Sequence, residues 1–511
     1  MGPCNCQPKM KMKIDDLSQP NPWWKDKEWT SKDIDLQRRR KSQVRWIPRL
    51  MYFFNLKQDA IYTMRGPRQV GKTTLIKIMI RERLNEGIHP KRIFFWACDL
   101  IDSPKELAKM LSCYLNSARE EYDGRLFIFL DEVSSIKDWQ KGIKHLVDAG
   151  LLQDCTVILT GSHSLDIKSA SERLPGRRGN VADVLDRILL PMKFSEYAEM
   201  RSKSDNKPKR FLNLLKKISE RAKRKEVLMQ LAHAKIPDEL IKLSSYSNEL
   251  THLFQEYLIT GGVPSAIDSF LAQGEIPSNI YNTYVTAMLG DAARWQKKDV
   301  HMGQIVQRLT ECLSSQVSWQ SLCKGTDLSS PQRVAECVDI LRYSFVVSTI
   351  YRLDRGKGGP RFEKEKKIYF QDPFIFHALR GWASSRSFYI NSLEYVGNPE
   401  TCSKLVESVI CNHLIRLAFN MFPSSDYEYA NRLFYWENSL RKEVDFVIKL
   451  NGKYIPIEVK YQSDVKKDDL LALQAFMQGG SSYLGIVITK DSLKIEENLV
   501  FLPACLFLTF I

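Results

Sequence analysis

The chain has 511 residues, of which 44% are hydrophobic and 11% aromatic, and a formal net charge of +15. This length excludes a single ordinary domain and favours two to four, and the apolar content supports well-formed cores. The excess of Lys and Arg favours an acidic partner, with nucleic acid first and an anionic membrane surface second, although ordinary solvated cations give the same charge.

The 11 cysteines are odd in number and include no Cys-x-x-Cys pair. This pattern favours reduced, mostly buried thiols over disulfides or a zinc site. The apolar stretch Leu499–Ile511 is too short to span a bilayer. We therefore expect a cytoplasmic protein with no membrane partner.

The most specific motif is Gly-Pro-Arg-Gln-Val-Gly-Lys-Thr-Thr, which matches the P-loop pattern G-x-x-x-x-G-K-[ST]. Its glycines let backbone N–H groups turn toward phosphates, its lysine reaches the β- and γ-phosphates, and its threonine hydroxyl binds Mg²⁺. The motif lies between an apolar strand and a helical pattern, so a helix N-terminus faces the phosphates. The predicted nucleotide-binding residues are Gly66, Pro67, Arg68, Gln69, Val70, Gly71, Lys72, Thr73 and Thr74.

Apolar strands alternate with helical patterns around this motif, which predicts a parallel sheet covered on both faces. Ligands of such sheets bind at the carboxyl ends of the strands. The P-loop, Asp131-Glu132 and Thr160-Gly-Ser162 all follow strands at such ends. The predicted strands are Ala60–Met64, Arg92–Ala97, Arg125–Leu130, Cys155–Leu159 and Arg187–Leu190.

These side chains are the candidates for ATP hydrolysis. Asp131 follows an apolar run, as a Walker B aspartate does, and is predicted to bind Mg²⁺ together with Thr73. Glu132 would orient or deprotonate water, Lys72 would bind the phosphates, and Thr160 or Ser162 would contact the γ-phosphate. Arg177 and Arg178 are candidates for an arginine finger or, alternatively, for a basic surface loop.

Basic and helical segments flank the sheet. Residues 1–37 are expected to be a poorly ordered arm, although its tryptophans suggest that part of it packs on something. Met200–Lys225 is rich in Lys and Arg and includes an amphipathic helix, which would contact nucleic acid or present a solvated face. Ile236–Gln296 is predicted to be helical.

Three helices and two strands are predicted between His301 and Phe370. The strands are Phe345–Ile350 and Lys367–Phe370, with a basic loop, Asp354–Lys366, between them. This order is typical of a winged helix, which commonly reads DNA with its third helix. A module that docks another protein is the alternative.

The C-terminal part shows a helix, three strands, a second helix and a strand. Asp445 lies on the second strand, and Glu458 and Lys460 share one face of the third by alternation. Two carboxylates and a lysine can bind Mg²⁺ or Mn²⁺ and activate water, and Glu407 on the first helix could add a third carboxylate.

The order of these motifs resembles the prokaryotic, especially archaeal, AAA-type P-loop ATPases that carry a winged helix and a C-terminal restriction-endonuclease-like domain. Further motifs that carry the resemblance are Leu-Asp-Glu-Val, Leu-Thr-Gly-Ser, Leu-Pro-Gly-Arg-Arg, Gly-Gly-Val-Pro, Asp-Pro, Leu-Val-Glu, Glu-Val-Asp-Phe-Val and Ile-Glu-Val-Lys. The resemblance implies ATP binding and hydrolysis, and it matches Asp445, Glu458 and Lys460 to the Asp…Glu-x-Lys nuclease motif. Val444 stands where the family usually has proline.

The expected fold class is α/β: a P-loop NTPase parallel sheet, then helical and winged-helix modules, then a restriction-endonuclease-like domain. The predicted domains are an arm (1–37), the ATPase (38–198), a helical region with a basic insertion (199–298), the winged helix (299–372) and the nuclease-like domain (373–511).

Three functions follow from this sequence. The first is an ATPase coupled to a Mg²⁺-dependent DNA nuclease, with catalytic Asp445, Glu458 and Lys460. The second is an ATP-dependent switch whose C-terminal half only binds nucleic acid or a protein. The third is a remodelling or signalling ATPase without a nucleic-acid role. RNA stays an alternative to DNA, and formation of a homo-oligomer stays open.

Overall fold

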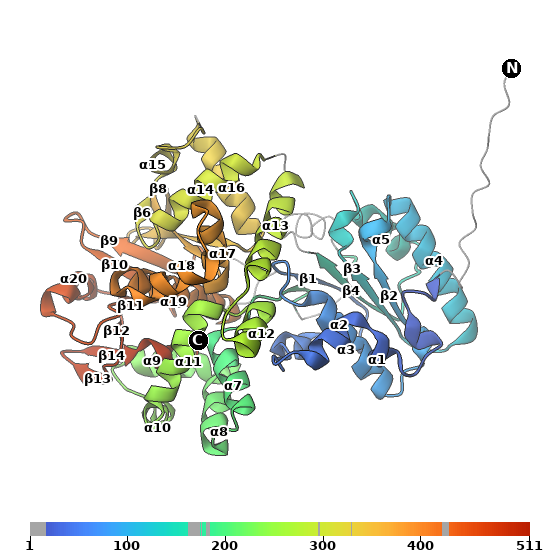
Figure 1. Ribbon diagram of the computed structural model, residues 1–511, viewed down its shortest axis with the longest axis horizontal. Helices are drawn as coiled ribbons and strands as arrows, with labels where there is room; N and C mark the ends of the chain where they lie inside the picture. Colours follow the sequence, from blue (N-terminus) through green and yellow to red (C-terminus); the bar gives the residue numbers. More distant parts are fainter. Residues whose placement is uncertain are drawn as a thin grey trace. The chain divides into compact units, whose positions relative to one another are not determined.

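The computed structural model describes residues 17–161, 174, 176–179, 184–294, 297–328, 330–421 and 429–511. It forms two compact units (Figure 1). The first contains residues up to Ser42, Ile47–Gly66 and Gly71–Leu189; the second contains Gln43–Trp46, Pro67–Val70 and Leu190–Ile511. None of the helices in the described residues is long and apolar enough to cross a membrane.

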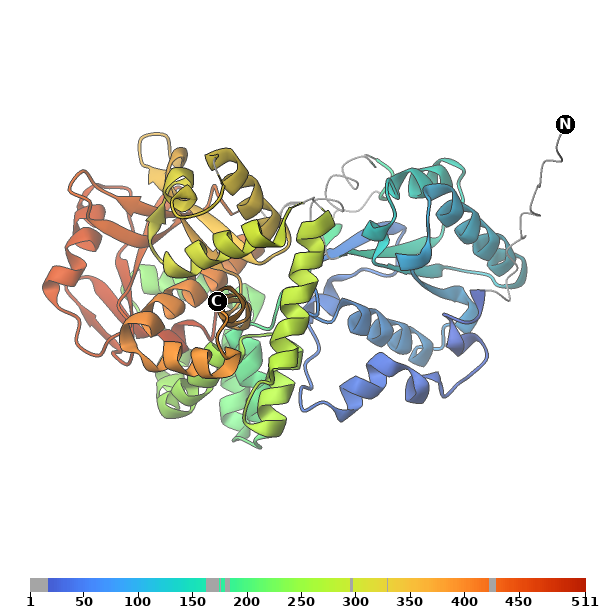
Figure 2. The same cartoon turned by 45° about the horizontal axis from the view of Figure 1, so that its top comes forward.

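The first unit is built on a five-stranded sheet in the order β2-β3-β4-β1-β5, and every pair in it is parallel. Buried apolar side chains fill the central strands, as expected for a sheet with helices on both faces. In two views, α4 and α5 lie on one face of this sheet and α3 on the other (Figures 1 and 2).

The strands of the first unit are β1 (Ala60–Arg65), β2 (Ile93–Ala97), β3 (Leu126–Asp131), β4 (Cys155–Gly161) and β5 (Asp186–Ile188). Its helices are α1 (Trp29–Lys32), α2 (Ile34–Lys41), α3 (Lys72–Asn85), α4 (Pro104–Glu121) and α5 (Gln140–Asp148). This architecture fits the P-loop NTPase fold that the sequence predicts.

Described residues of the N-terminal arm pack against the edge strand β2. The side chain of Asn21 forms two hydrogen bonds with the backbone of Phe95, at 3.1 Å and 2.7 Å. Trp23 and Trp24 donate their indole N–H groups to the carbonyl of Ile93. Because these contacts satisfy the backbone of an edge strand, the expectation of poor order is wrong for residues 17–37.

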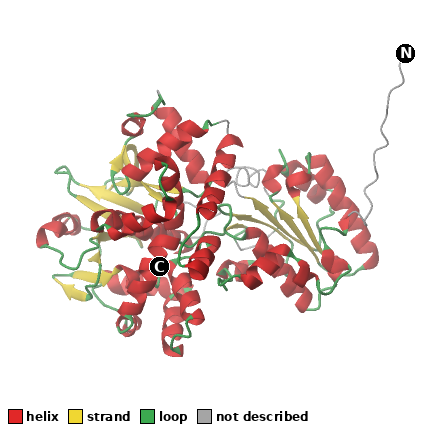
Figure 3. Ribbon diagram, in the orientation of Figure 1, coloured by secondary structure: helices red, strands yellow, loops and turns green. Residues whose placement is uncertain are grey.

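The second unit combines many helices with one mixed sheet (Figure 3). Its earlier helices are α7 (Phe194–Ser204), α8 (Lys209–Ile218), α9 (Arg221–Ala232), α10 (Asp238–Ser244), α11 (Ser247–Thr260), α12 (Pro264–Gln273), α13 (Ser278–Arg294), α14 (Asp299–Glu311), α15 (Trp319–Cys323) and α16 (Pro331–Tyr343). Its later helices are α17 (Pro373–Ser384), α18 (Phe388–Gly397), α19 (Pro399–Met421), α20 (Leu471–Gln478) and α21 (Ala504–Phe507).

The mixed sheet has nine strands in the order β13-β14-β12-β11-β10-β9-β7-β8-β6. Its strands are β6 (Gln316–Val317), β7 (Val347–Asp354), β8 (Gly359–Phe370), β9 (Leu433–Glu437), β10 (Glu443–Leu450), β11 (Lys453–Val459), β12 (Gly485–Thr489), β13 (Lys494–Glu496) and β14 (Leu499–Pro503). The hairpin β7–β8 joins the C-terminal strands because β7 pairs in parallel with β9. The sheet is thus continuous across residue 372, and the predicted domain boundaries stay predictions.

The hairpin differs from its prediction in length. Strand β8 starts at Gly359, so residues 359–366 of the predicted basic loop are strand. The glycine and the charged side chains of this run favour a loop, yet its backbone pairs with β7 as far as Asp354. The three helices α14, α15 and α16 precede the hairpin in the expected order.

Two apolar clusters cover the two faces of the C-terminal strands. On β10, Phe446 and Ile448 belong to the larger cluster, while Val447 between them belongs to a smaller one that includes Phe476 of α20. This alternation is what a strand buried on both faces requires. Helix α19 contributes a row of buried side chains to the larger cluster, which holds Glu407 against the sheet.

Polar contacts fix the helices of this unit to one another. Asp372 begins α17 and accepts hydrogen bonds from the backbone N–H groups of Gly262 and Phe374, at 2.7 Å and 2.9 Å. His413 of α19 accepts the N–H of Phe194 at Nε2, at 3.1 Å, and its Nδ1 lies 2.8 Å from the carbonyl of Val409. This geometry requires a neutral imidazole with its proton on Nδ1, and burial lowers the pKa of His413 well below its usual value.

Candidate functional site

The P-loop connects β1 to α3. A Cβ on Gly66 would lie 2.0 Å from the carbonyl oxygen of Leu189, so a larger residue does not fit there. Gly71 precedes α3 with a φ of 97°, in the left-handed region that favours glycine. The chain therefore makes the tight turn that presents backbone N–H groups at a helix N-terminus.

A buried lysine lies within this turn. Lys72 is 6% exposed and donates from Nζ to the carbonyl of Gly66 at 3.0 Å. It also forms an ion pair with Glu132, with 3.7 Å between Nζ and Oε1. The structure therefore places a buried cation and a carboxylate side by side at the carboxyl ends of β1 and β3.

Two strands, β3 and β4, and the helix α3 bring the polar side chains together. Thr73 donates its hydroxyl to Asp131 Oδ2 at 2.5 Å, and Thr160 donates to the other oxygen of the same carboxylate. The backbone N–H of Glu132 donates to the Thr160 hydroxyl at 3.0 Å. Glu132 has a φ of 49°, a left-handed conformation that costs energy in a non-glycine residue and recurs at functional sites.

These residues fit a nucleotide with Mg²⁺. A threonine hydroxyl and an aspartate carboxylate in contact are the pair that holds Mg²⁺ in P-loop NTPases. The remaining predicted loop residues also lie in the turn: Val70 is buried, Gln69 has a φ of 61°, and Arg68 pairs with Asp291 at 2.6 Å. Pro67 is buried, Thr74 lies in the first turn of α3, and Ser162 lies outside the described residues.

The two arginine-finger candidates have different surroundings. Arg178 forms an ion pair with Asp186 at 3.0 Å and donates to the carbonyl of Ile61, near the start of β1. It therefore joins β1 to β5 and lies away from the carboxyl end that carries the P-loop, so we assign it a structural role. Arg177 pairs with Asp148 at 2.6 Å and is partly exposed, and its role as a finger stays a prediction.

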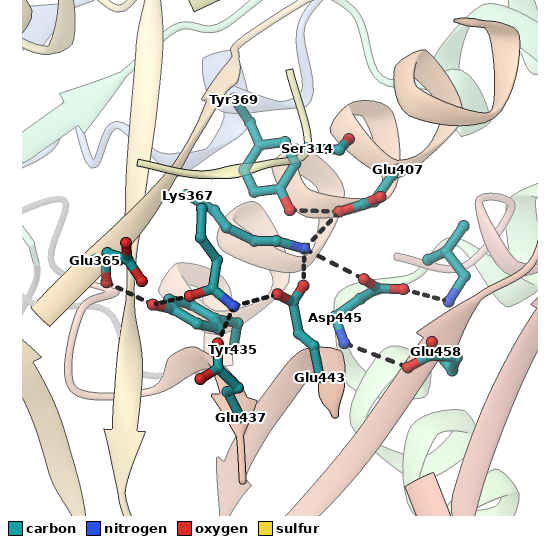
Figure 4. Close-up of polar contacts among 12 residues, drawn as sticks. Ser314, Glu365, Lys367, Tyr369, Glu407, Tyr435, Glu437, Glu443, Asp445 and Glu458 are labelled. Carbon is teal, nitrogen blue, oxygen red and sulfur yellow. Dashed lines mark hydrogen bonds and ion pairs between the residues drawn. The ribbon is translucent and has the colours of Figure 1, made fainter. Parts of the chain in front are cut away.

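A second polar cluster lies in the C-terminal half (Figure 4). The ammonium of Lys367, whose side chain is 1% exposed, contacts Glu407 at 2.9 Å and Asp445 at 3.2 Å. It also contacts Glu443. Lys367, which no sequence motif singles out, comes from β8 and reaches carboxylates on α19 and β10.

The carboxylates of Asp445 and Glu458 in this cluster also accept hydrogen bonds from other N–H donors. Asp445 Oδ2 accepts the backbone N–H of Val459 at 2.9 Å. Glu458 Oε1 accepts from Lys460 at 2.6 Å, and its Oε2 lies 3.4 Å from the backbone N of Asp445. In the part of the chain that the structure describes, no group of three or more His, Cys, Asp or Glu could hold a metal ion. Lysine ammonium groups and a backbone N–H already occupy the oxygens of Asp445 and Glu458, so the residues present do not fit the predicted second Mg²⁺ or Mn²⁺.

Burial and the neighbouring charges shift the pKa values of the groups in this cluster. Burial raises the pKa of Glu458, and the neighbouring Asp445 charge adds to the shift. Burial also raises the pKa of Glu407. Burial alone would lower the pKa of Lys367, but the carboxylates around it outweigh burial and raise that pKa well above its usual value. The surrounding carboxylates therefore favour the charged form of Lys367 inside the protein.

Basic side chains gather on one face of α8. Phe211, Leu215 and Ile218 are buried. The opposite face exposes Lys209, Arg210, Asn213, Lys216 and Lys217. The spacing of these exposed residues follows the helical repeat, so they form one cationic ridge, which we call the α8 ridge. Lys217 within it pairs with Glu239 at 3.0 Å.

The third helix of the predicted winged helix is less basic. Its exposed residues include Arg333 and Glu336, and Glu336 pairs with Lys297 at 2.6 Å. Its other charged pair joins Arg342 to Asp339 at 3.0 Å. Positive and negative charges thus balance on α16, in contrast to the α8 ridge.

Family models match three parts of the chain. An AAA domain model matches residues 58–198. Two models described as domains of unknown function, DUF8612 and DUF4143, match residues 251–386 and 403–507. No curated protein matches the chain.

Several solved structures from archaea are similar to this one. A Walker-type ATPase of Pyrococcus abyssi has a TM-score of 0.38 and 12% identity, covering 73% of this chain and 99% of its own. The ORC1 protein of Aeropyrum pernix, solved in complex with DNA, has a TM-score of 0.28 and 12% identity and covers 63% of this chain and 86% of its own. Cdc6p from Pyrobaculum aerophilum has a TM-score of 0.24 and 11% identity, covering 74% and 97%. The P-loop geometry, the parallel sheet and the AAA domain match together support a P-loop ATPase in the N-terminal part of this chain.

Proposed function

We propose that this chain is an ATP-hydrolysing switch whose C-terminal half binds nucleic acid, with DNA as the expected partner. The observation that carries the ATPase is the network in which Asp131 accepts hydrogen bonds from both Thr73 and Thr160 beside the P-loop. This network joins β3, β4 and α3 at the edge where parallel sheets bind ligands.

Each residue at this edge has a proposed role. Backbone N–H groups of the P-loop and the ammonium of Lys72 bind the phosphates. Thr73 and Asp131 would hold Mg²⁺, which neutralises charge that develops on the phosphate oxygens. Phosphate oxygens that bind Lys72 compete with its ion pair to Glu132. Glu132 is then released to orient the attacking water, and Thr160 holds the backbone of Glu132 in place.

Nucleic-acid binding rests on the α8 ridge and on the net charge of +15. A row of Lys and Arg along an exposed helix face binds phosphates without reading sequence. The balanced charges of α16 give less support to DNA reading by the predicted third helix of a winged helix.

The ATPase assignment is tested with purified full-length chain, measuring binding of ATP and release of phosphate in Mg²⁺. Lys72→Ala should lose both. Lys105→Ala is the matched control, since Lys105 is an exposed lysine on α4, and it should leave both unchanged. Turnover that survives in Lys72→Ala would contradict the ATPase assignment.

The nucleic-acid assignment is tested by titrating labelled double-stranded DNA, single-stranded DNA and RNA at several salt concentrations. The double variant Lys209→Glu/Lys216→Glu should weaken binding to duplex DNA and reduce the salt slope by about 1 for each phosphate that the variant no longer neutralises. The control is Lys105→Glu/Lys109→Glu, two exposed lysines of α4. Equal weakening of DNA binding in the two variants would refute the role of the ridge, and preference for RNA would change the partner.

A further inference from the structure

Strand β8 carries Lys367 into the carboxylates that the sequence predicts as a nuclease site (Figure 4). We infer that the Lys367 ammonium is the resident cation of this cluster and takes the place of a divalent metal. The C-terminal half then binds its partner without cutting nucleic acid. This inference is independent of the P-loop and of ATP hydrolysis.

The contacts of Lys367 match what an ammonium can do. An ammonium has three N–H donors and no acceptor. Lys367 Nζ contacts three carboxylates: Glu407, Glu443 and Asp445. These carboxylates come from two elements, α19 and β10, so the lysine lies between the groups that a bridging metal would share.

The surrounding carboxylate oxygens do not converge on a second cation position. A divalent ion such as Mg²⁺ requires several oxygen ligands at about 2.0–2.1 Å in near-octahedral geometry. Asp445 directs Oδ1 to Lys367 and Oδ2 to the backbone N–H of Val459. Glu458 directs Oε1 to Lys460. A metal would have to replace each of these donors.

The backbone holds Lys367 in this position. It lies in the β-ladder opposite Ile350 of β7 and opposite Gln316 of β6. Strand β7 pairs with β9, and β9 pairs with β10, which carries Asp445. Lysine and carboxylate therefore belong to one sheet, and Nζ cannot leave the cluster by a simple hinge motion of the hairpin.

Neighbouring polar groups complete the arrangement. Tyr369 donates its hydroxyl to the same Glu407 oxygen that Lys367 contacts, at 2.6 Å. The side-chain amide of Gln316 donates to Glu443 and Glu437. A β-bulge lies between Val444 and Val447, where β10 changes its register against β9. Bulges commonly redirect a side chain next to a functional site, and here the redirected segment includes Asp445.

The direct test measures Mn²⁺ binding to the full-length chain without nucleotide, by electron paramagnetic resonance of free Mn²⁺. The wild type and Asp445→Asn should bind the same amount of Mn²⁺. Lys367→Ala should gain one Mn²⁺ per chain, and Lys367→Ala/Asp445→Asn should lose it again. If the wild type bound Mn²⁺ and Asp445→Asn removed that binding, the inference would be overturned. It would also be overturned if Lys367→Ala folded and gained no Mn²⁺ site.

A second measurement does not depend on the folding of the Lys367 variant. Wild-type protein is incubated with labelled single- and double-stranded DNA in Mg²⁺ or Mn²⁺, with and without ATP. We expect no cleavage of either DNA. Phosphate release from ATP is measured in the same samples. Cleavage that Asp445→Asn abolishes would overturn the inference and leave the ATPase proposal intact.

Discussion

Replacement of Lys367 by methionine would remove a buried cation and keep a side chain of similar length. Three carboxylates would then lose their shared partner inside the protein. Removing one partner of a buried ion pair typically costs about 3–5 kcal/mol. We expect the second unit of Lys367→Met to lose free energy of unfolding in that range, because the three carboxylates cannot all reach water.

Hydrogen exchange of backbone amides measures this loss within the intact chain. Amides of α19 and β10 that exchange through unfolding of the second unit should exchange roughly 150-fold to 5,000-fold faster in Lys367→Met. A second substitution, Glu407→Gln, should restore part of the protection, since it removes one of the uncompensated charges.

The matched control is Lys404→Met, which breaks an exposed ion pair to Glu400 on α19, the helix that also carries Glu407. Exposed pairs contribute little, so its exchange should stay close to that of the wild type. If Lys367→Met and Lys404→Met changed exchange equally, Lys367 would not be the central cation of the cluster.

Three further predictions concern the rest of the structure. Gly66→Ala should reduce ATP binding strongly while the second unit keeps its hydrogen-exchange protection, because the added Cβ meets a backbone carbonyl at 2.0 Å; unchanged binding would contradict the described turn. His413 has a lowered pKa, so the unfolded chain binds a proton more readily, and stability should fall as pH drops below about 6.5. His413→Gln should have a lower melting temperature than the wild type at pH 7, but its melting temperature should fall less between pH 7 and pH 5. An equally large fall in the two proteins would refute this assignment. Arg178→Met should lower the melting temperature of the first unit by leaving buried Asp186 without its cation, whereas Arg177→Ala should reduce ATP turnover without that shift if Arg177 is the finger.

The nucleotide site was predictable because most of its functional residues lie in one short segment. The two glycines, Lys72 and Thr73 have a fixed spacing, and Asp131 follows an apolar strand whose carboxyl end can be inferred. The contact between Asp131 and Thr160 follows from the parallel sheet, which places neighbouring strand ends side by side. The role of Arg178 was less predictable, because its ion pair with Asp186 and its hydrogen bond to the carbonyl of Ile61 depend on how β1 and β5 pair.

Lys367 shows where sequence reasoning fails. It ends the basic run Lys-Glu-Lys-Lys, which is typical of an exposed loop. The carboxylates around it belong to α19 and β10, which lie far away in sequence. Lys366 beside it is also buried, with its ammonium 4.2 Å from the ring of Trp319. The one local signal is the alternation that leads into Ile368 and Phe370, which already predicts a strand at this position.

The arm shows the opposite case, in which composition misleads but single residues help. Its polar and proline-rich sequence predicts poor order, yet Trp23 and Trp29 are each 3% exposed. Their indole rings lie 5.0 Å apart, edge to face. Large aromatic side chains in a polar segment are therefore a better guide to packing than the average composition.

The central claim, that the P-loop, Asp131 and Glu132 hydrolyse ATP, is tested most directly by single-turnover hydrolysis with Glu132→Gln. This variant keeps the contacts of Lys72 with Gly66 and of Thr73 with Asp131 but lacks the carboxylate that would orient water. We predict that it binds ATP as tightly as the wild type and hydrolyses it roughly 10²- to 10⁴-fold more slowly, the range of a general base. Hydrolysis at the wild-type rate would contradict the proposed role of Glu132 and the mechanism built on it.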